Sequence, residues 1–355
     1  MKVLVLPRYN RLGASSRLRI FQYSHYLEDA GISLTFLPLF SDQYVLRLQK
    51  GKRNIFDISS AYFTRAFYLL QKKEYDLLWI EKELLPWLPV WVERVLLSSH
   101  IPYVLDYDDA VFHYYDMHQN YFIRKLLGGK HRALLGNATL VIAGNDYLAA
   151  YAEEAGAGRV AVLPTVVDLE RYTTEVCKNI QHRSNSPCVG WIGQYASSQF
   201  LLPYKFLFEK FTLEGKANFM AVGIDALSLG LRMRSEPWSE DTEVSLLQNF
   251  DIGIMPLTDG PFERGKCGYK LIQYMACGLP VVASPIGINR ELVTHGINGF
   301  LADTYQEWEE ALSTLLSDEG LRKQMGREGR RIVEDKYNLQ KIAPQLAALL
   351  KSAIG

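Results

Sequence analysis

Cysteine is scarce in this sequence. The 355 residues include four cysteines, with no C-x-x-C pair and no histidine at zinc-finger spacing: Cys177, Cys188, Cys267 and Cys277. This pattern excludes a disulfide scaffold and a zinc module, and it is typical of separate reduced thiols. We therefore expect a cytoplasmic protein.

Long apolar runs, targeting segments and a charge imbalance are also missing. The first residues, KVLVLP, read as a strand, with no signal-peptide pattern, and no apolar run approaches the roughly 20 residues of a membrane-spanning helix. The 39 basic and 39 acidic side chains give a net charge of zero, so no general attraction to nucleic acid is expected. The sequence contains neither short repeats nor low-complexity tracts.

Charge is uneven along the chain, however. Residues 1–75 hold twelve Lys/Arg against five Asp/Glu. Within them, residues 47–73 (RLQKGKRNIFDISSAYFTRAFYLLQKK) interleave cations with aromatic side chains. This segment predicts either a helix lying on an anionic membrane or a helix that packs into a core with solvated lysines.

Short apolar segments alternate with helix-length segments in both halves of the chain, which predicts an α/β protein with parallel sheets. The expected strands of the first half are Val3–Leu6, Leu34–Pro38, Leu77–Ile80, Tyr103–Asp106, Leu140–Ala143 and Ala161–Pro164. Those of the second half are Cys188–Ile192, Asn218–Val222, Ile252–Met255, Pro280–Ser284 and Gly299–Leu301. One helix is expected over Leu18–Ala30 and another over Leu339–Ile354.

The polar segment 173–187 fits an interdomain linker. We therefore expect an N-terminal Rossmann-like domain over 1–172 and a C-terminal one over 188–337. The helix in 338–355 could pack back on the N-terminal domain. Ligands of such sheets bind at the carboxyl ends of the strands.

The first strand leads into PRYNRLGASSRLR, which lacks the G-x-G-x-x-G dinucleotide fingerprint. Gly13 could let the backbone approach an anion, with Arg17 and Arg19 on the following helix. The alternative is an ordinary glycine turn with two solvated arginines.

Three acids, Asp106, Asp108 and Asp109, follow one strand in VLDYDDAVFHYYDMH. They could bind Mg²⁺, act as a base or hydroxyl ligand for a sugar, or cap local backbone. We expect at least one of these carboxylates, but not all three, to face a ligand. His113 and His118 share the loop without a third metal ligand.

Further strand–helix junctions carry small and polar residues. Asn145 is expected mainly to cap a helix, with ligand contact second. Gly190 and Gly193 fit either a phosphate-binding turn or tight strand–helix packing.

The segment GPFERGKCGYKLIQYMACGLP places cations at a helix N-terminus, against the helix dipole. A bound diphosphate would remove this conflict, whereas a solvated charge run is the alternative. The residues concerned are Glu263, Arg264, Lys266 and Lys270.

The residues of the second half resemble those of GT-B glycosyltransferases, and specifically of glycosyltransferase family 4. The resemblance covers nearly the whole chain and is strongest in DIGIMPL, YMACGLPVVAS and GINRELVTHGINGFLA, with LRKQMGREGRRIVEDKY matching the closing helices. It implies two Rossmann-like domains facing each other across a cleft. It also implies a retaining transferase of hexosyl type that needs no metal or other cofactor and uses a nucleotide-diphosphate sugar as donor.

The chain departs from the family pattern at several positions. Gly265 and Gln273 replace a pair of glutamates, and Asp108 replaces a common histidine. The usual basic pair after the first strand of the C-terminal domain is absent, with Gln194 and Ser198–Gln199 in that region. These departures indicate a divergent subgroup in which GKCGYK replaces the usual glutamate-containing loop.

The resemblance and the residues together assign the candidate site. Lys266 and Asp108 are the expected catalytic residues, and no metal ligands are expected. The expected donor-binding residues are Gly193, Glu263, Arg264, Gly265, Cys267, Gly268, Lys270 and Gln273. Those of the N-terminal domain are Gly13, Arg17, Asp109 and Asn145.

The expected partners are a nucleotide sugar, a glycan or lipid-linked acceptor of polysaccharide or glycolipid biosynthesis, and an anionic membrane contacted through residues 47–73 on the inner face of the cell membrane. No nucleic acid is expected. Two alternatives remain, a nucleotide-sugar epimerase of the same fold and a catalytically degenerate nucleotide-binding protein.

Overall fold

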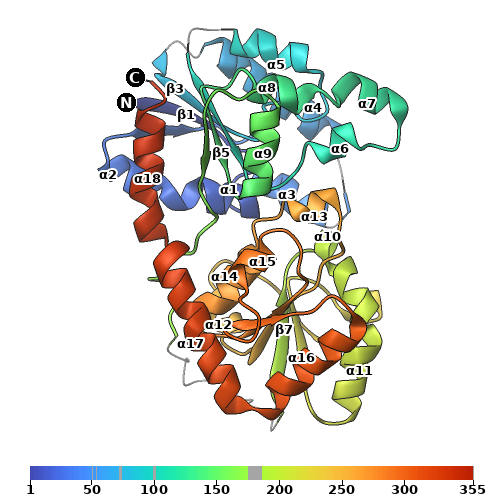
Figure 1. Ribbon diagram of the computed structural model, residues 1–355. Coiled ribbons are helices and arrows are strands. Elements are labelled where there is room, and N and C mark those ends of the chain that lie inside the picture. Colours follow the sequence, from blue (N-terminus) through green and yellow to red (C-terminus); the bar gives the residue numbers. More distant parts are fainter. Residues whose placement is uncertain (50, 53, 72–73, 99–100, 175–185, 355) are drawn as a thin grey trace. The chain divides into compact units, whose positions relative to one another are not determined.

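Each half of the chain builds one six-stranded parallel sheet with helices around it (Figure 1). The computed structural model describes residues 1–49, 51–52, 54–71, 74–98, 101–174 and 186–354. The first of two units combines Met1–Thr165, Gly265–Cys267 and Leu339–Gly355. The second combines Val166–Arg264 and Gly268–Asn338. Most of the expected linker, and Cys177 within it, lies outside the described residues.

The first sheet has the order β2-β1-β3-β4-β5-β6, and every neighbouring pair is parallel. Its central strands are buried along their length because helices cover both faces. The strands are β1 (Lys2–Leu6), β2 (Ser33–Phe36), β3 (Leu77–Glu81), β4 (Tyr103–Tyr107), β5 (Leu140–Ala143) and β6 (Val160–Val162).

The helices of the first unit are α1 (Ala14–Arg19), α2 (Ser24–Asp29), α3 (Asp42–Gln49), α4 (Ile55–Leu70), α5 (Val90–Leu97), α6 (His113–Asp116), α7 (Tyr121–Leu127), α8 (Lys130–Leu135), α9 (Asp146–Glu154) and α18 (Leu339–Lys351). The connections from β2 to β3 and from β3 to β4 advance in the same direction along the sheet. Right-handed crossovers therefore place α4 and α5 over one face. On the first unit, α18 packs against α2 (Figure 1).

The single helix expected over Leu18–Ala30 is wrong. The structure divides it into α1, a short 3-10 turn at Phe21–Tyr23, and α2. Ile20 leaves the helical region, with φ −126° and ψ −68°, between the buried Arg19 side chain and the turn. Tertiary burial of a charged side chain thus overrides local periodicity here.

The second sheet has the order β12-β11-β10-β7-β8-β9 and is also parallel. Its strands are β7 (Cys188–Ile192), β8 (Asn218–Val222), β9 (Arg234–Glu236), β10 (Ile252–Met255), β11 (Val281–Ala283) and β12 (Gly299–Leu301). The sequence did not predict β9, because this polar edge strand has no apolar run. Hydrophobic clusters cover both faces of the sheet.

The helices of the second unit are α10 (Tyr195–Ser198), α11 (Lys205–Leu213), α12 (Glu243–Leu247), α13 (Pro261–Arg264), α14 (Tyr269–Ala276), α15 (Asn289–Leu292), α16 (Tyr305–Ser317) and α17 (Glu319–Lys336). Helix α14 packs against β10 and α17. Across the described ranges, no helix is both long and apolar enough to cross a bilayer.

Candidate functional site

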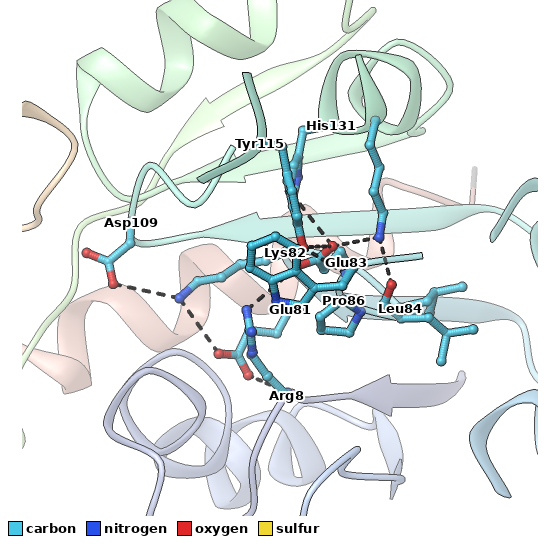
Figure 2. Close-up of polar contacts among 12 residues, drawn as sticks. Arg8, Glu81, Lys82, Glu83, Leu84, Pro86, Asp109, Tyr115 and His131 are labelled. Atoms are coloured by element: carbon cyan, nitrogen blue, oxygen red, sulfur yellow. Dashed lines mark hydrogen bonds and ion pairs between the residues drawn. The ribbon is translucent and has the colours of Figure 1, made fainter. Parts of the chain in front are cut away.

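In the first unit, charged side chains gather where β3 and β4 end (Figure 2). The two strands are in register, with Glu81 beside Asp106, and the Lys82 amide donates to the Asp106 carbonyl at 3.0 Å. The Glu81 carboxylate accepts hydrogen bonds from Ser16 Oγ at 2.6 Å and from the Arg8 amide at 2.8 Å. This edge of a parallel sheet is where ligands of such folds bind.

Lys82 lies at the centre of this group. Its Nζ is 2.7 Å from Asp108 Oδ1, 3.8 Å from Asp109 Oδ2 and 4.0 Å from Glu81 Oε1, and it donates to Ser15 Oγ at 3.2 Å. The Lys82 side chain is buried, whereas Asp109 is more exposed than Asp108. Lys82 thus holds the two aspartates that the sequence placed in the candidate site.

The charges of this group shift its pKa values. Burial alone would raise the pKa of Asp108, but the Lys82 ammonium lowers it below its usual value. Burial alone would lower the pKa of Lys82, but Asp108, Asp109 and Glu81 raise it. Burial raises the pKa of Glu81, against the opposing effect of Lys82. Asp108 is therefore kept ionised at neutral pH and can accept a hydrogen bond from a hydroxyl group.

A second buried charge network supports the loop that begins at Lys82. Lys130 Nζ lies 2.7 Å from both Glu83 Oε2 and Glu93 Oε1, and it donates to the Leu85 carbonyl at 2.7 Å. Glu93 also accepts from the Leu85 amide at 2.9 Å. His131 is buried beside this network. Burial lowers the pKa of His131 to about 4, so its ring is neutral at pH 7.

This loop also holds two strained residues. Lys82 and Trp87 are the non-glycine residues with positive φ in the described part of the chain, at 64° and 63°. The Trp87 amide donates to the Tyr115 hydroxyl at 3.0 Å, and the Tyr115 hydroxyl donates to Glu83 at 3.0 Å. Such backbone strain persists only where the surroundings fix it, and it clusters at functional sites.

The burial and contacts of Asp106, Arg17 and Arg19 differ from the alternatives that the sequence left open. Arg17 and Arg19 are both buried, so two solvated arginines are wrong. Arg19 Nε donates to Asp106 Oδ1 at 2.8 Å, and its Nη1 donates to the Leu163 carbonyl at 2.7 Å. Gly13 packs so closely that an added Cβ would lie 2.4 Å from Tyr9 Cβ. Arg19 therefore pairs with Asp106 inside the first unit and does not face solvent.

Asn145 caps α9, as the sequence predicted, by accepting from the Leu148 amide at 3.0 Å. Its Nδ2 also donates to the carbonyls of Gly265 and Lys266, at 3.0 and 3.1 Å, within the first unit. The buried Cys267 follows in the same segment, and burial raises the pKa of its thiol. Asn145 therefore contacts the expected diphosphate loop, in addition to its role as a cap.

The histidines of the DYDDA loop have protein partners. His113 contacts Asp116 Oδ1 and the Tyr147 hydroxyl, each at 2.9 Å, and the Asn120 amide donates to His118 Nδ1 at 3.0 Å. In the part of the chain that the structure describes, no group of three or more His, Cys, Asp or Glu side chains could hold a metal ion.

In the second unit, Gly268 caps α14 with a left-handed backbone, φ 64°. A Cβ at this position would lie 2.3 Å from Leu292 Cδ1, so both the conformation and the packing require glycine. The first amides of a helix have no partner within the helix, which is why helix N-termini can bind anions.

Gly193 and Lys270 lie together next to this turn. A Cβ on Gly193 would be 2.6 Å from the Trp191 ring and 2.9 Å from Lys270 Cε. Lys270 Nζ lies 5.4 Å from the centroid of the Trp191 ring, within the range of a cation–π contact. The structure thus brings together two predicted donor-binding residues that are far apart in sequence.

The other predicted donor-binding side chains lie differently. Gln273 is buried and donates to the Tyr172 hydroxyl at 2.8 Å, inside the core. Arg264 makes a bidentate pair with Asp259, at 2.7 and 2.8 Å. Glu263 and Lys266 are half-buried. The ribose role of Gln273 stays a prediction, and its amide has a partner in the core.

Sequence reasoning missed Glu81, Lys82 and Glu83. The signal was present in WIEKELLPW, where three charges follow an apolar strand just as DYDD follows the next one. The remote partners Glu93, Lys130 and His131 leave no such local signal, because only the fold brings them to this loop.

Comparison with known proteins places part of the chain in a family model. Residues 237–332 match the model described as Glycosyl transferases group 1. The N-acetyl-alpha-D-glucosaminyl L-malate synthase of Bacillus anthracis is 34% identical over 86 residues, which is 23% of this chain and 22% of that protein. The matched segment thus spans under a quarter of that curated relative.

Solved structures match over nearly the whole chain. Sucrose-phosphate synthase from Thermosynechococcus elongatus has a TM-score of 0.73 at 16% identity, covering 99% of this chain and 98% of that one. Anabaena HepE in complex with UDP-glucose has a TM-score of 0.71 at 20% identity, covering 99% of this chain and 100% of that one. The fold is GT-B. The two six-stranded parallel sheets agree with this assignment.

Proposed function

We propose that this protein is a retaining glycosyltransferase that moves a hexose from a nucleotide-diphosphate sugar to a glycan or lipid-linked acceptor of polysaccharide or glycolipid biosynthesis. The observation that carries the proposal is the family match over 237–332, which includes α14, its Gly268 cap and Lys270. The complexes of HepE with UDP and with UDP-glucose support a uridine nucleotide as the first donor to try.

In this proposal, Lys266, Lys270 and the amides that begin α14 stabilise the departing diphosphate, which gains charge as the sugar leaves. Side-chain cations and backbone amides do the work that a metal does elsewhere, so no metal is required. Gly193 has no side chain, so Lys270 and the Trp191 ring can lie close to its backbone.

On the first unit, Asp108 accepts a hydrogen bond from a sugar hydroxyl at the reacting face, because Lys82 keeps it ionised. Asp109, which is more exposed, contributes a further acceptor. Gly13, Arg17 and Asn145 complete this side of the proposed site. Family 4 membership and a cytoplasmic location, peripheral to the membrane, belong to the same proposal.

A thermal-shift screen of UDP-, GDP- and ADP-sugars tests the proposal first, since a ligand that binds the native state raises the melting temperature by mass action. The stabilising donor is then incubated with extracted glycans and lipids, with and without EDTA. We expect sugar transfer in both cases. Stabilisation by no nucleotide sugar contradicts the proposal.

The same assay separates the alternatives. An epimerase changes the donor sugar without an acceptor, whereas a transferase at most hydrolyses it slowly. A degenerate binding protein binds the nucleotide sugar and turns over on no acceptor. None of the comparisons favours the epimerase.

A further inference from the structure

The loop that follows β3 buries two leucines and exposes one tryptophan. Leu84 and Leu85 are 0% and 2% exposed, whereas Trp87 is 49% exposed. Trp87 also has φ 63°, in the left-handed region that disfavours a residue with a Cβ. The fold therefore keeps a strained backbone at a residue that is only half-buried, and strain of this kind clusters where ligands bind.

Side chains of α4, α5 and α8 hold the backbone of this loop. The amides of Leu84 and Leu85 donate to the two carboxylate oxygens of Glu93, at 3.0 and 2.9 Å. The loop carbonyls accept three further hydrogen bonds: Leu84 from Arg65 Nη1 at 3.2 Å, Leu85 from Lys130 Nζ at 2.7 Å and Pro86 from the Tyr62 hydroxyl at 2.6 Å. The loop is thus preorganised, so a ligand that binds it does not have to order it first.

The rings next to Trp87 lie nearly perpendicular to its indole. The Trp87 amide donates to the Tyr115 hydroxyl at 3.0 Å, and that hydroxyl donates to the Glu83 carboxylate (Figure 2). The Tyr115 ring lies 5.0 Å from the indole at an interplanar angle of 79°, and the His118 ring lies 6.0 Å away at 86°. In the part of the chain that the structure describes, no aromatic ring therefore stacks in parallel on the indole, and its exposed part is left to a ligand.

Trp87 lies within reach of the group at Lys82. It follows Lys82 by five residues, and an extended chain of five residues spans at most about 18 Å. Lys82 Nζ in turn lies 2.7 Å from Asp108 Oδ1, the carboxylate proposed to accept from a sugar hydroxyl. A short oligosaccharide spans such a distance. A sugar chain whose reacting end lies at Asp108 can therefore place a further unit at the indole.

The charges around this loop favour a neutral ligand. Acidic side chains outnumber the basic ones with which they pair: Glu81, Glu83, Glu93, Asp108 and Asp109 against Arg8, Lys82 and Lys130. A phosphate or carboxylate ligand would therefore meet no excess of positive charge. Arg8 and Asp109, whose side chains are 21% and 30% exposed, offer hydrogen-bond donors and acceptors to neutral hydroxyl groups instead.

We propose that Trp87 stacks on a neutral pyranose ring of the acceptor, in a subsite one or more sugar units from the reacting hydroxyl. A pyranose carries C–H groups on its faces and hydroxyl groups around its rim, so it matches an exposed indole bordered by polar side chains. The inference rests on the proposed transferase function, and it narrows the acceptor to a sugar chain, either free or lipid-linked. Sugar units, and not a lipid chain, are then what Trp87 recognises.

The indole N–H signals in a two-dimensional NMR spectrum of the full chain test the inference without any need for turnover. The sequence holds six tryptophans, and the signal that is absent from W87F belongs to Trp87. The probes are maltotriose, cellotriose and triacetylchitotriose as free sugar chains, with octyl maltoside standing for a lipid-linked one. We expect at least one of the free trisaccharides to shift the Trp87 signal. Tighter binding of octyl maltoside than of maltotriose, with the same shift, would identify a lipid-linked sugar as the source.

Trp91 gives the matched control, because it is 64% exposed on the regular helix α5, four residues further along the chain. Its signal, assigned with W91F, should not shift. W87L keeps an apolar side chain without a flat ring, so it should bind the sugar at least about tenfold more weakly than wild type. W87F keeps the flat ring and should stay within about threefold. If Trp87 served only to pack against Tyr115, W87L and W87F would bind alike.

The proposed function and this inference fail in different measurements. Thermal shift with UDP-sugars needs no acceptor, so a lack of stabilisation there contradicts the transferase, whereas the indole signals report on Trp87 alone. Circular dichroism checks that every variant is folded. The inference is overturned when no probe shifts the Trp87 signal, when octyl maltoside shifts it and no free sugar does, or when folded W87L binds sugar as tightly as wild type.

Discussion

Lys82 holds the carboxylates of the first unit in place at the cost of an unfavourable backbone conformation. Its φ of 64° is in the left-handed region, which costs a residue with a Cβ about 1–2 kcal/mol. The pairs with Asp108 and Asp109 and the Glu83–Lys130–Glu93 network offset that cost. The position of one ammonium group thus depends on contacts from several segments.

Replacing Lys82 should destabilise the protein most at neutral pH. In wild type the pKa of Asp108 is lowered, so the stability from the pair is present above the ordinary carboxyl pKa of about 4 and is lost as pH falls through the lowered value. In K82M, burial raises the pKa of Asp108, and the unpaired carboxylate costs about 3–5 kcal/mol at pH 7. Urea unfolding should therefore show a deficit that shrinks towards pH 4.

The double variant K82M/D108N is the control for this prediction. Removing both charges should recover much of the loss at pH 7, because the carboxylate nearest to Lys82 is then no longer left unpaired. A deficit that is the same at pH 7 and pH 4, or a double variant no more stable than K82M, would contradict the assigned pair.

Lys266 is the residue to test for a role in the chemical step. K266A should reduce kcat by about 10²–10³-fold if the ammonium stabilises the leaving diphosphate, a loss of about 2.7–4 kcal/mol. Lys216, which is exposed and pairs with Glu214, gives the control K216A. Turnover of K266A equal to that of K216A would rule out the assigned role.

The sequence predicted part of this site from local patterns. DYDD and the Asn145 cap were readable because charged and capping residues follow apolar strands directly. Lys82 could have been found in the same way, from WIEKELLPW. The burial of Arg19 against Asp106 could not, because periodicity on a short helix does not reveal which side chain a distant strand will pair with.

At the scale of elements, helix α14 depends on the turn that begins it. Gly268 has φ 64°, and a Cβ there would meet Leu292. G268A should therefore be less stable than the wild type. The left-handed conformation of an alanine costs about 1–2 kcal/mol of folding free energy, and overpacking against Leu292 costs about 1–3 kcal/mol more. Urea denaturation measures the loss.

Gly215 supplies the matched control. It has nearly the same φ, 66°, but nothing lies within 4 Å of the position of its Cβ. G215A should lose only the folding free energy that the left-handed conformation costs, because its Cβ would meet no neighbouring atom. Equal losses in G215A and G268A would show that Leu292 yields without cost.

Most strands could be predicted as elements because their apolar runs are continuous, as in LVIA of β5. Strand β9 could not be predicted, since its polar residues RSE form a strand through backbone pairing with β8. The break between α1 and α2 was equally hidden, because Ile20 is apolar and fits the helical pattern. Packing decides both features.

At the scale of the whole molecule, the zero net charge removes the repulsion between copies near pH 7. Together with the exposed phenylalanines of α4, which are Phe56, Phe63 and Phe67, this predicts most self-association close to neutral pH. Dynamic light scattering should show smaller particles at pH 9, where the net charge is negative. F56S/F63S/F67S should reduce association at pH 7. F206S/L213S, which removes two exposed side chains of α11 in the second unit, should do so less.

Helix α18, which follows the second unit in the sequence, packs into the first unit with Ile342, Leu346 and Leu350 buried. The second unit is therefore inserted within the first in the order of synthesis. During translation, β7 to α17 emerge from the ribosome before the first unit has all its parts. Until α18 arrives, the surface of α2 that it covers stays open to solvent and to chaperones. A helix made after the second unit thus completes a unit whose strands were made before it.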